Sequence, residues 1–201
     1  MFTLTIFPSL LLAALACGAA PAWADKADRS KPMTLESDQP CTVSLLKQTS
    51  VCSGNVVISQ GTLQIRADRL ELRESPQGYQ MALALGTAAR PASYRQKRDG
   101  ADEFVEGRAE RIDYDSKAGT LRFEGAAVVR RLRGATVADE IQGAVILWDS
   151  AAESFNVQGG VKTDANPGGR VRAVITPRVP DDAASAPGGA LKSSPALGDR
   201  R

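Results

Sequence analysis

Catalytic chemistry in this chain would have to come from carboxylates or thiols, because none of its 201 residues is a histidine. That absence removes the commonest general base, the usual catalytic triads and most zinc sites. Close pairs of carboxylates could still act as acid and base, as in glycoside hydrolysis. The chain has three such pairs: Asp102 with Glu103, Asp113 with Asp115, and Asp139 with Glu140. We expect all three at turns or on outward strand positions, so the sequence predicts no enzyme, cofactor or metal site.

Two cysteines, Cys41 and Cys52, lie close together in the sequence. In an oxidising compartment an even pair at short spacing is a disulfide candidate. The alternative is two reduced, packed thiols, because a bridge needs Cα atoms within about 7 Å.

Basic residues form two local clusters, within 94–98 (YRQKR) and 130–133 (RRLR). Such clusters can pair with phosphates, for example on a lipid head group, but they are more often solvated faces. The formal net charge of +2 is too mild to require a nucleic-acid partner.

The elements that would position these groups begin after an apolar leader. Residues 1–24 end in Ala22-Trp23-Ala24 and have the pattern of a signal peptide cleaved after Ala24, which predicts export. A transmembrane helix is the alternative, but the strongly apolar run is shorter than the roughly 20 residues that a span needs. We expect a short flexible lead at 25–30, one domain at 31–166, and a disordered tail at 167–201, where Pro, Gly, Ala, Ser and charged residues dominate.

The domain consists of short runs of alternating apolar and polar residues separated by turn residues, which is typical of antiparallel β-structure. A weak repeat of a polar or small residue, Gly, any residue, and Val or Ala occurs five times. We interpret its glycines as corners where long strands bend: Gly54, Gly107, Gly125, Gly143 and Gly159. The aliphatic interior, poor in aromatic rings, fits either an ordinary core or a slot for an acyl chain.

Several segments in order resemble the OstA-like family of periplasmic lipopolysaccharide-transport proteins. The resemblance covers roughly residues 29–164, and its segments are Lys31–Asp38, Ser53–Leu63, Ala67–Leu70, Pro91–Gly100, Val105–Ala109, Ile112–Tyr114 and Leu121–Ala127. Each segment alone is weak, but their order and spacing are specific. The Cys41 and Cys52 pair is not a general feature of that family.

The resemblance implies an all-β, open antiparallel jellyroll that holds the acyl chains of lipopolysaccharide. It also implies inner-membrane and outer-membrane partners with the same fold, and head-to-tail self-association in the periplasm. The expected lipid-binding residues are Met33, Leu35, Val56, Ile58, Leu63, Ile65, Leu70, Leu72, Tyr94, Ile112, Tyr114, Leu121 and Phe123. The alternative is a secreted β-sandwich that binds a protein or a polysaccharide.

Self-association would use the unpaired edges of the open jellyroll. We expect the early edge at Met33–Val43 and the late edge at Phe155–Val161, with Leu35 of one molecule near Val157 of the next.

Overall fold

The computed structural model describes residues 28, 30–98, 102–160 and 168–177, so the predicted signal peptide lies outside the described residues. No helix in the described part of the chain is long and apolar enough to cross a membrane. The fold is all-β, as the sequence predicts. Its strands are β1 (Met33–Glu36), β2 (Thr42–Ser44), β3 (Thr49–Gln60), β4 (Leu63–Glu74), β5 (Gln80–Leu85), β6 (Ala92–Lys97), β7 (Glu103–Ala109), β8 (Arg111–Asp115), β9 (Thr120–Arg133), β10 (Thr136–Asp149), β11 (Ser154–Gln158) and β12 (Arg172–Ile175).

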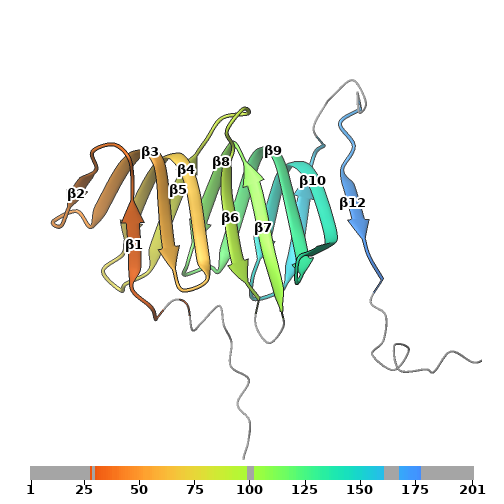
Figure 1. Ribbon diagram of the computed structural model, residues 1–201, viewed down its shortest axis with the longest axis horizontal. Helices are drawn as coiled ribbons and strands as arrows, with labels where there is room; N and C mark the ends of the chain where they lie inside the picture. Colours follow the sequence, from red (N-terminus) through yellow and green to blue (C-terminus); the bar gives the residue numbers. More distant parts are fainter. Residues whose placement is uncertain (1–27, 29, 99–101, 161–167, 178–201) are drawn as a thin grey trace, which may run out of the picture.

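These strands form one antiparallel sheet that is folded over into two layers (Figure 1). The front layer contains β1, β6, β7 and β12, and the back layer contains β2, β5, β8 and β11. Four long strands, β3, β4, β9 and β10, belong to both. The first half of β9 pairs with β8, for example, while its second half pairs with β7. The two layers are therefore covalently continuous along one side, the fold line, which runs along the top of Figure 1.

Glycines mark the places where the long strands cross the fold line. The pairing of β3 with β4 shifts register between Ser53 and Val56, where Gly54 has φ of 77° and Asn55 has φ of 46°. In β9, Gly125 has φ of 82°, and the register with β10 shifts between Gly143 and Val145. Each shift bends its strand as a β-bulge does. The interpretation as corners is thus confirmed at Gly54, Gly125 and Gly143.

Gly107 has a different role. It lies inside the regular pairing of β7 with β6 and β9. A Cβ atom here would lie 2.2 Å from Cε1 of Phe123. The prediction of a corner is wrong at this position, where glycine instead allows an aromatic ring to lie against the backbone.

The end of the domain differs from the prediction of a disordered tail from residue 167. Residues Arg172–Ile175 form β12, which pairs with β10 from Asp139 to Gln142. The segment has no core to join, and all four residues are exposed. Its ladder uses the backbone groups that β10 would otherwise leave unpaired, which composition alone does not reveal.

The predicted flexible lead also contains an anchored residue. Asp28 is buried and accepts a hydrogen bond from Gln96 at 3.2 Å and one from Thr62. Lys31 Nζ lies 3.3 Å from its carboxylate. These contacts tie the start of the described chain to the front layer.

Candidate functional site

The interior between the two layers is the candidate site. Alternate side chains of every long strand point into it, and they join into one continuous apolar cluster. All thirteen residues proposed from the sequence belong to this cluster. Ten of them are buried, and Met33, Leu35 and Leu72 are partly buried against it. The sequence therefore placed these residues on the correct face, while their contact with lipid remains a proposal.

The interior also contains residues that the sequence analysis did not propose as lipid-binding. They lie on β7, β9, β10 and β11: Val105, Val129, Ile141, Ile146, Trp148, Phe155 and Val157. Strand alternation would have identified Ile146 with Trp148 and Phe155 with Val157.

Two aromatic contacts shape this interior. Tyr94 and Phe123 meet edge to face with ring centroids 6.1 Å apart, which joins the front layer to the back layer. Trp148 and Phe155 stack at 4.2 Å near the late end. A cavity of about 40 Å³ lies between the layers, with Tyr94 and Trp148 in its wall. That space holds at most a few water molecules, so this cavity is too small for an acyl chain.

The inner face of the front layer changes from apolar to charged toward its free margin. We call this margin the front rim; it is formed by the β3–β4 turn, the end of β6, the start of β7 and the β9–β10 turn. Inward positions at the front rim carry polar or charged groups in place of aliphatic ones: Gln60, Gln96, Arg98, Glu103, Arg131, Arg133 and Asp139. Within the described part of the chain, no buried side-chain polar atom lacks a hydrogen-bond partner.

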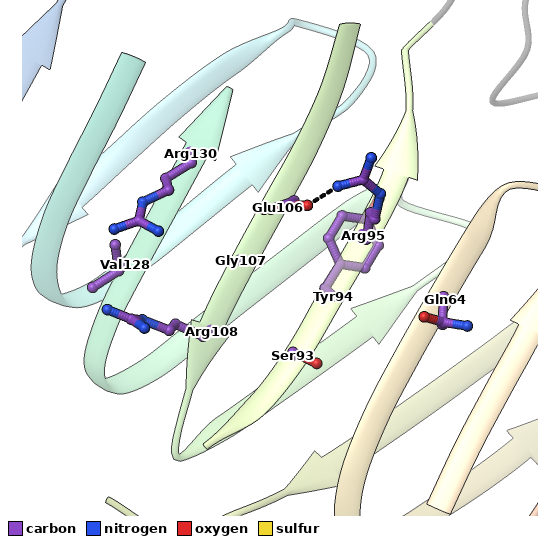
Figure 2. Close-up of a pocket in the computed structure, with 9 residues that line it drawn as sticks. All are labelled: Gln64, Ser93, Tyr94, Arg95, Glu106, Gly107, Arg108, Val128 and Arg130. Atoms are coloured by element: carbon purple, nitrogen blue, oxygen red, sulfur yellow. Dashed lines mark hydrogen bonds and ion pairs between the residues drawn. The ribbon is translucent and has the colours of Figure 1, made fainter. Parts of the chain in front are cut away.

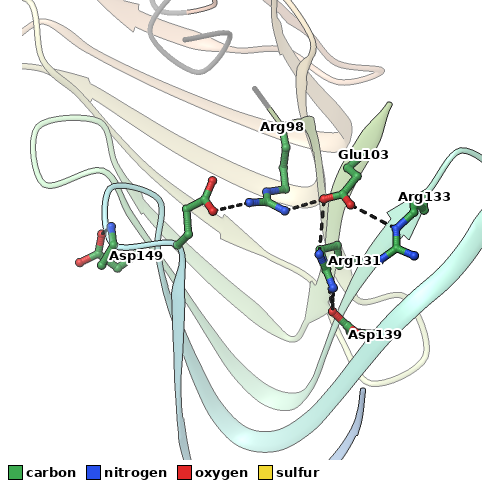
Figure 3. Close-up of polar contacts among 8 residues, drawn as sticks. Arg98, Glu103, Arg131, Arg133, Asp139 and Asp149 are labelled. Carbon is green, nitrogen blue, oxygen red and sulfur yellow. Dashed lines mark hydrogen bonds and ion pairs between the residues drawn. The ribbon is translucent and has the colours of Figure 1, made fainter. Parts of the chain in front are cut away.

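Glu103 is the centre of the ion pairs at the front rim (Figure 3). Its carboxylate lies 2.5 Å from Arg98, 3.3 Å from Nε of Arg133 and 3.5 Å from Arg131. Arg131 also pairs with Asp139. Burial alone would raise the pKa of Glu103, but the positive charges of Arg131, Arg98 and Arg133, with a hydrogen bond from Arg133, outweigh it and lower the pKa below its ordinary value.

The buried carboxylate of Asp28 follows the same principle. Burial opposes its charge, but hydrogen bonds from Thr62, Gln96 and Lys31 lower the pKa of Asp28 below its ordinary value. It therefore adds a second fixed negative charge close to the end of β6.

Glu103 and Asp139 correct the expectation that all the carboxylate pairs lie at turns or face outward. Both continue the inward parity of their strands, although each is paired with arginine. The other members agree better with the expectation: Glu140 pairs with Arg130 at 2.7 Å, Asp113 pairs with Arg111 at 2.6 Å, and Asp115 accepts backbone hydrogen bonds in a turn.

Cys41 and Cys52 form a disulfide with their Cα atoms 4.3 Å apart. Cys52 is buried in the interior cluster, while Cys41 lies just before β2. The bridge ties the β1–β2 connection to β3 at the early end of the sheet. The turn between β2 and β3 exposes two apolar side chains, with Leu45 at 88% and Leu46 at 94% of full exposure.

A hollow of about 300 Å³ lies on the outer face of the front layer, around Arg95, Glu106, Arg108 and Arg130 (Figure 2). Arg95 pairs with Glu106, and Arg95 also covers the ring of Phe104 with its guanidinium carbon 4.0 Å from the centroid. These four side chains have the opposite parity to Val105, so they point away from the apolar interior, although Tyr94 also borders the hollow.

The edges of the sheet require another correction. β1 lies at the early edge of the front layer, but β11 lies at the late edge of the back layer. An added strand continues the layer that it joins, so a contact of Leu35 with Val157 does not fit this geometry. The front layer ends in β1 and β12, and the back layer ends in β2 and β11.

Comparison with known proteins agrees with this architecture. The family model described as LptA/(LptD N-terminal domain) LPS transport protein matches residues 34–154. The lipopolysaccharide export system protein LptA of Escherichia coli K12 is 30% identical over 106 residues, which cover 53% of this chain and 56% of that protein. LptA of Shigella flexneri gives the same values. The alignment thus spans little more than half the length of these curated relatives.

A solved structure shares the fold. LptH, described as the LptA-homologous periplasmic component of the lipopolysaccharide transport device of Pseudomonas aeruginosa, superposes with a TM-score of 0.61 at 22% identity. The superposition covers 75% of this chain and 99% of the LptH chain. The family match over residues 34–154, which is more than half of the sequence, shows that the chain belongs to the LptA/LptD N-terminal domain family of lipopolysaccharide transport proteins.

Proposed function

We propose that this protein is a periplasmic carrier that binds the acyl chains of lipopolysaccharide between its two layers and passes the lipid between the inner and the outer membrane. The observation that carries the proposal is the continuous apolar interior of a sheet that is closed along the fold line only. Burial of apolar surface contributes about 0.8 kcal/mol per methylene, so even one sheltered chain offsets much of its cost in water.

The partners that fit this geometry are domains with the same fold. Strands β1 and β2 end the two layers at one end of the molecule, and β12 and β11 end them at the other. An incoming jellyroll could continue both layers and extend the interior without a break. We therefore propose head-to-tail self-association, with related domains at the two membranes as terminal partners. The carrier role is non-enzymatic.

Neighbouring valines allow a matched test of lipid contact. Val56 and Val129 point into the interior, whereas Val57 and Val128 are the adjacent residues on the outer face. A photo-crosslinking amino acid is placed at each position in cells, and adducts are detected with antibody against lipopolysaccharide. We expect adducts from positions 56 and 129 and few from 57 and 128. Equal labelling of both faces, or none from the interior, would overturn the proposal.

A further inference from the structure

Among the residues that the structure describes, one ion pair bridges the open side of the jellyroll. Nη2 of Arg98, at the front rim, lies 2.5 Å from the carboxylate of Glu153. Glu153 belongs to the β10–β11 turn, at the free margin of the back layer. Arg98 continues the inward parity of β6 and is 16% exposed, while Glu153 is 59% exposed. The pair therefore joins the two layers on the side opposite the fold line.

Glu153 stands where the turn favours glycine. The β8–β9 turn (DSKAG) and the β10–β11 turn (DSAAE) have the same construction: Asp115 and Asp149 each accept two backbone hydrogen bonds. The fifth residue is left-handed in both, with φ of 69° at Gly119 and 49° at Glu153. A non-glycine residue in this region carries a cost of about 1 kcal/mol. The chain thus holds a carboxylate against Arg98 despite a backbone preference for glycine.

The charges at the front rim favour an anion at this place. Arg98, Arg131 and Arg133 surround the two carboxylates of Glu103 and Asp139, so these five side chains carry a net charge of +1 without Glu153. The carboxylate of Asp28, close to the end of β6, is balanced by Lys31. Glu153 supplies the balancing negative charge from the other layer. The cavity of about 40 Å³ lies directly under this pair, between Tyr94 and Trp148, and leads toward the apolar interior.

We infer that Arg98 is the centre of a binding site for a phosphate group of the lipid head, and that the carboxylate of Glu153 occupies this site until the lipid displaces it. The inference rests on the proposed carrier function and names the head-group contact of that function. An amphiphile with its chains in the interior would have its charged head at the front rim. The guanidinium of Arg98 can hold a phosphate with two parallel hydrogen bonds, and phosphate carries more negative charge than the carboxylate that it replaces.

Displacement of Glu153 would also break the ion pair between the front rim and the free margin of the back layer. The layers could then separate to admit acyl chains, which the cavity of the closed structure is too small to hold. Head-group binding and opening of the interior are therefore coupled, because the phosphate replaces the carboxylate of Glu153 on the guanidinium of Arg98.

The test compares two lipids. A fluorescent acyl probe is displaced from the folded protein by lipid A that carries both phosphates, or by the same lipid A after enzymatic removal of its phosphates. We expect Arg98→Gln to weaken binding of the phosphorylated lipid about tenfold, the value of one charge-assisted hydrogen bond. Binding of the dephosphorylated lipid should change much less. Glu153→Gln should strengthen binding of the phosphorylated lipid several-fold, because the competing charge is gone.

The outward pair Arg122 and Glu124 provides matched controls, since it is an arginine–glutamate pair on the outer face of the back layer. Arg122→Gln and Glu124→Gln should leave both affinities unchanged. Arg98→Lys keeps the charge without the bidentate geometry, so its affinity for the phosphorylated lipid should lie between those of the wild type and Arg98→Gln. If circular dichroism shows that Arg98→Gln does not fold, Arg98→Lys takes its place in the comparison.

Three results decide between the explanations. If Arg98→Gln binds the two lipids with the same ratio of affinities as the wild type, the phosphate site is refuted. The role of Arg98 would then be the structural ion pair that joins the two layers. Saturable, Arg98-dependent binding of inorganic phosphate alone, without any effect of Arg98 on lipid affinity, indicates a small-anion site and also overturns the assignment to a head group. Failure of both lipids to displace the probe from the wild type refutes the carrier function itself.

Discussion

The close approach of Gly107 to Phe123 predicts a large effect from one methyl group. A Cβ atom at position 107 would lie 2.2, 2.5 and 3.0 Å from three ring carbons of Phe123. Carbon atoms in contact normally lie about 3.5–4.0 Å apart, so the ring would have to retreat by at least about 1 Å. Phe123 is fully buried and meets the edge of Tyr94, which leaves it little room. Overpacking of this kind costs about 1–3 kcal/mol, and Gly107→Ala should lower the free energy of unfolding by that amount.

Urea denaturation followed by circular dichroism measures this change. The control is a double-mutant cycle with Phe123→Leu, which removes the ring that the new methyl group meets. Phe123→Leu should destabilise the protein on its own, but the double variant should be more stable than the sum of the two effects predicts, by at least about 0.5 kcal/mol. Since Gly107 is not in the left-handed region, backbone strain does not contribute. Additive effects, or a Gly107→Ala protein as stable as the wild type, would refute the argument.

Three further predictions concern the disulfide, pH and the edges. Replacing Cys41 and Cys52 with serine should cost up to about 3 kcal/mol, the chain-entropy value for so short a loop, and mass spectrometry of unfolded, unreduced, alkylated wild type should find neither thiol labelled. The pKa of Glu103 is lowered from an ordinary 4.5, so its ionised carboxylate stabilises the folded state fully above pH 4.5, and this stabilisation is lost as the pH falls through the lower folded-state pKa. The melting temperature should therefore fall less between pH 7 and pH 3 for Glu103→Gln than for the wild type. An equal fall in the two proteins would count against this. If β12 of one molecule meets β1 of the next, the double variant Thr34→Cys with Val174→Cys should form disulfide-linked ladders on a non-reducing gel, and neither single variant should extend beyond a dimer.

The fold class and the inward face of most strands could be predicted from the sequence, because side chains alternate between the two faces of a strand and each layer buries only one of its faces. The rule failed at Glu103 and Asp139, where the parity is correct but the residues are charged. In the sequence, an inward-facing carboxylate cannot be told from an outward-facing one unless its arginine partners are known. The partners Arg131 and Arg133 of Glu103 lie on β9, whereas Glu103 lies on β7. β12 was missed for a related reason, since its pairing depends on an open edge of β10 and not on its own composition.

Gly107 shows another limit of sequence reasoning. Its repeat matches those of Gly54 and Gly125, but the cause of glycine at position 107 is a ring that lies 16 residues further along the chain. Gly107 pairs with Val129 in the front layer, whereas Phe123 pairs with Ile112 in the back layer. Only the folding of the sheet into two layers brings Gly107 and Phe123 together.

The order of the strands along the molecule has a consequence for its internal motions. Each strand pairs only with its immediate neighbours in the stack, so the structure resembles a short solenoid in which local stability adds up from one neighbour to the next. The ends have neighbours on one side only, and amide hydrogen exchange should therefore be fastest in β1, β2, β11 and β12 and slowest around β4 and β9. A partner that adds a strand to either end would convert a fraying terminus into an interior position. Binding would then slow amide hydrogen exchange at the docked end and leave it unchanged at the far end. The exchange pattern would therefore show which end of the molecule the partner joins.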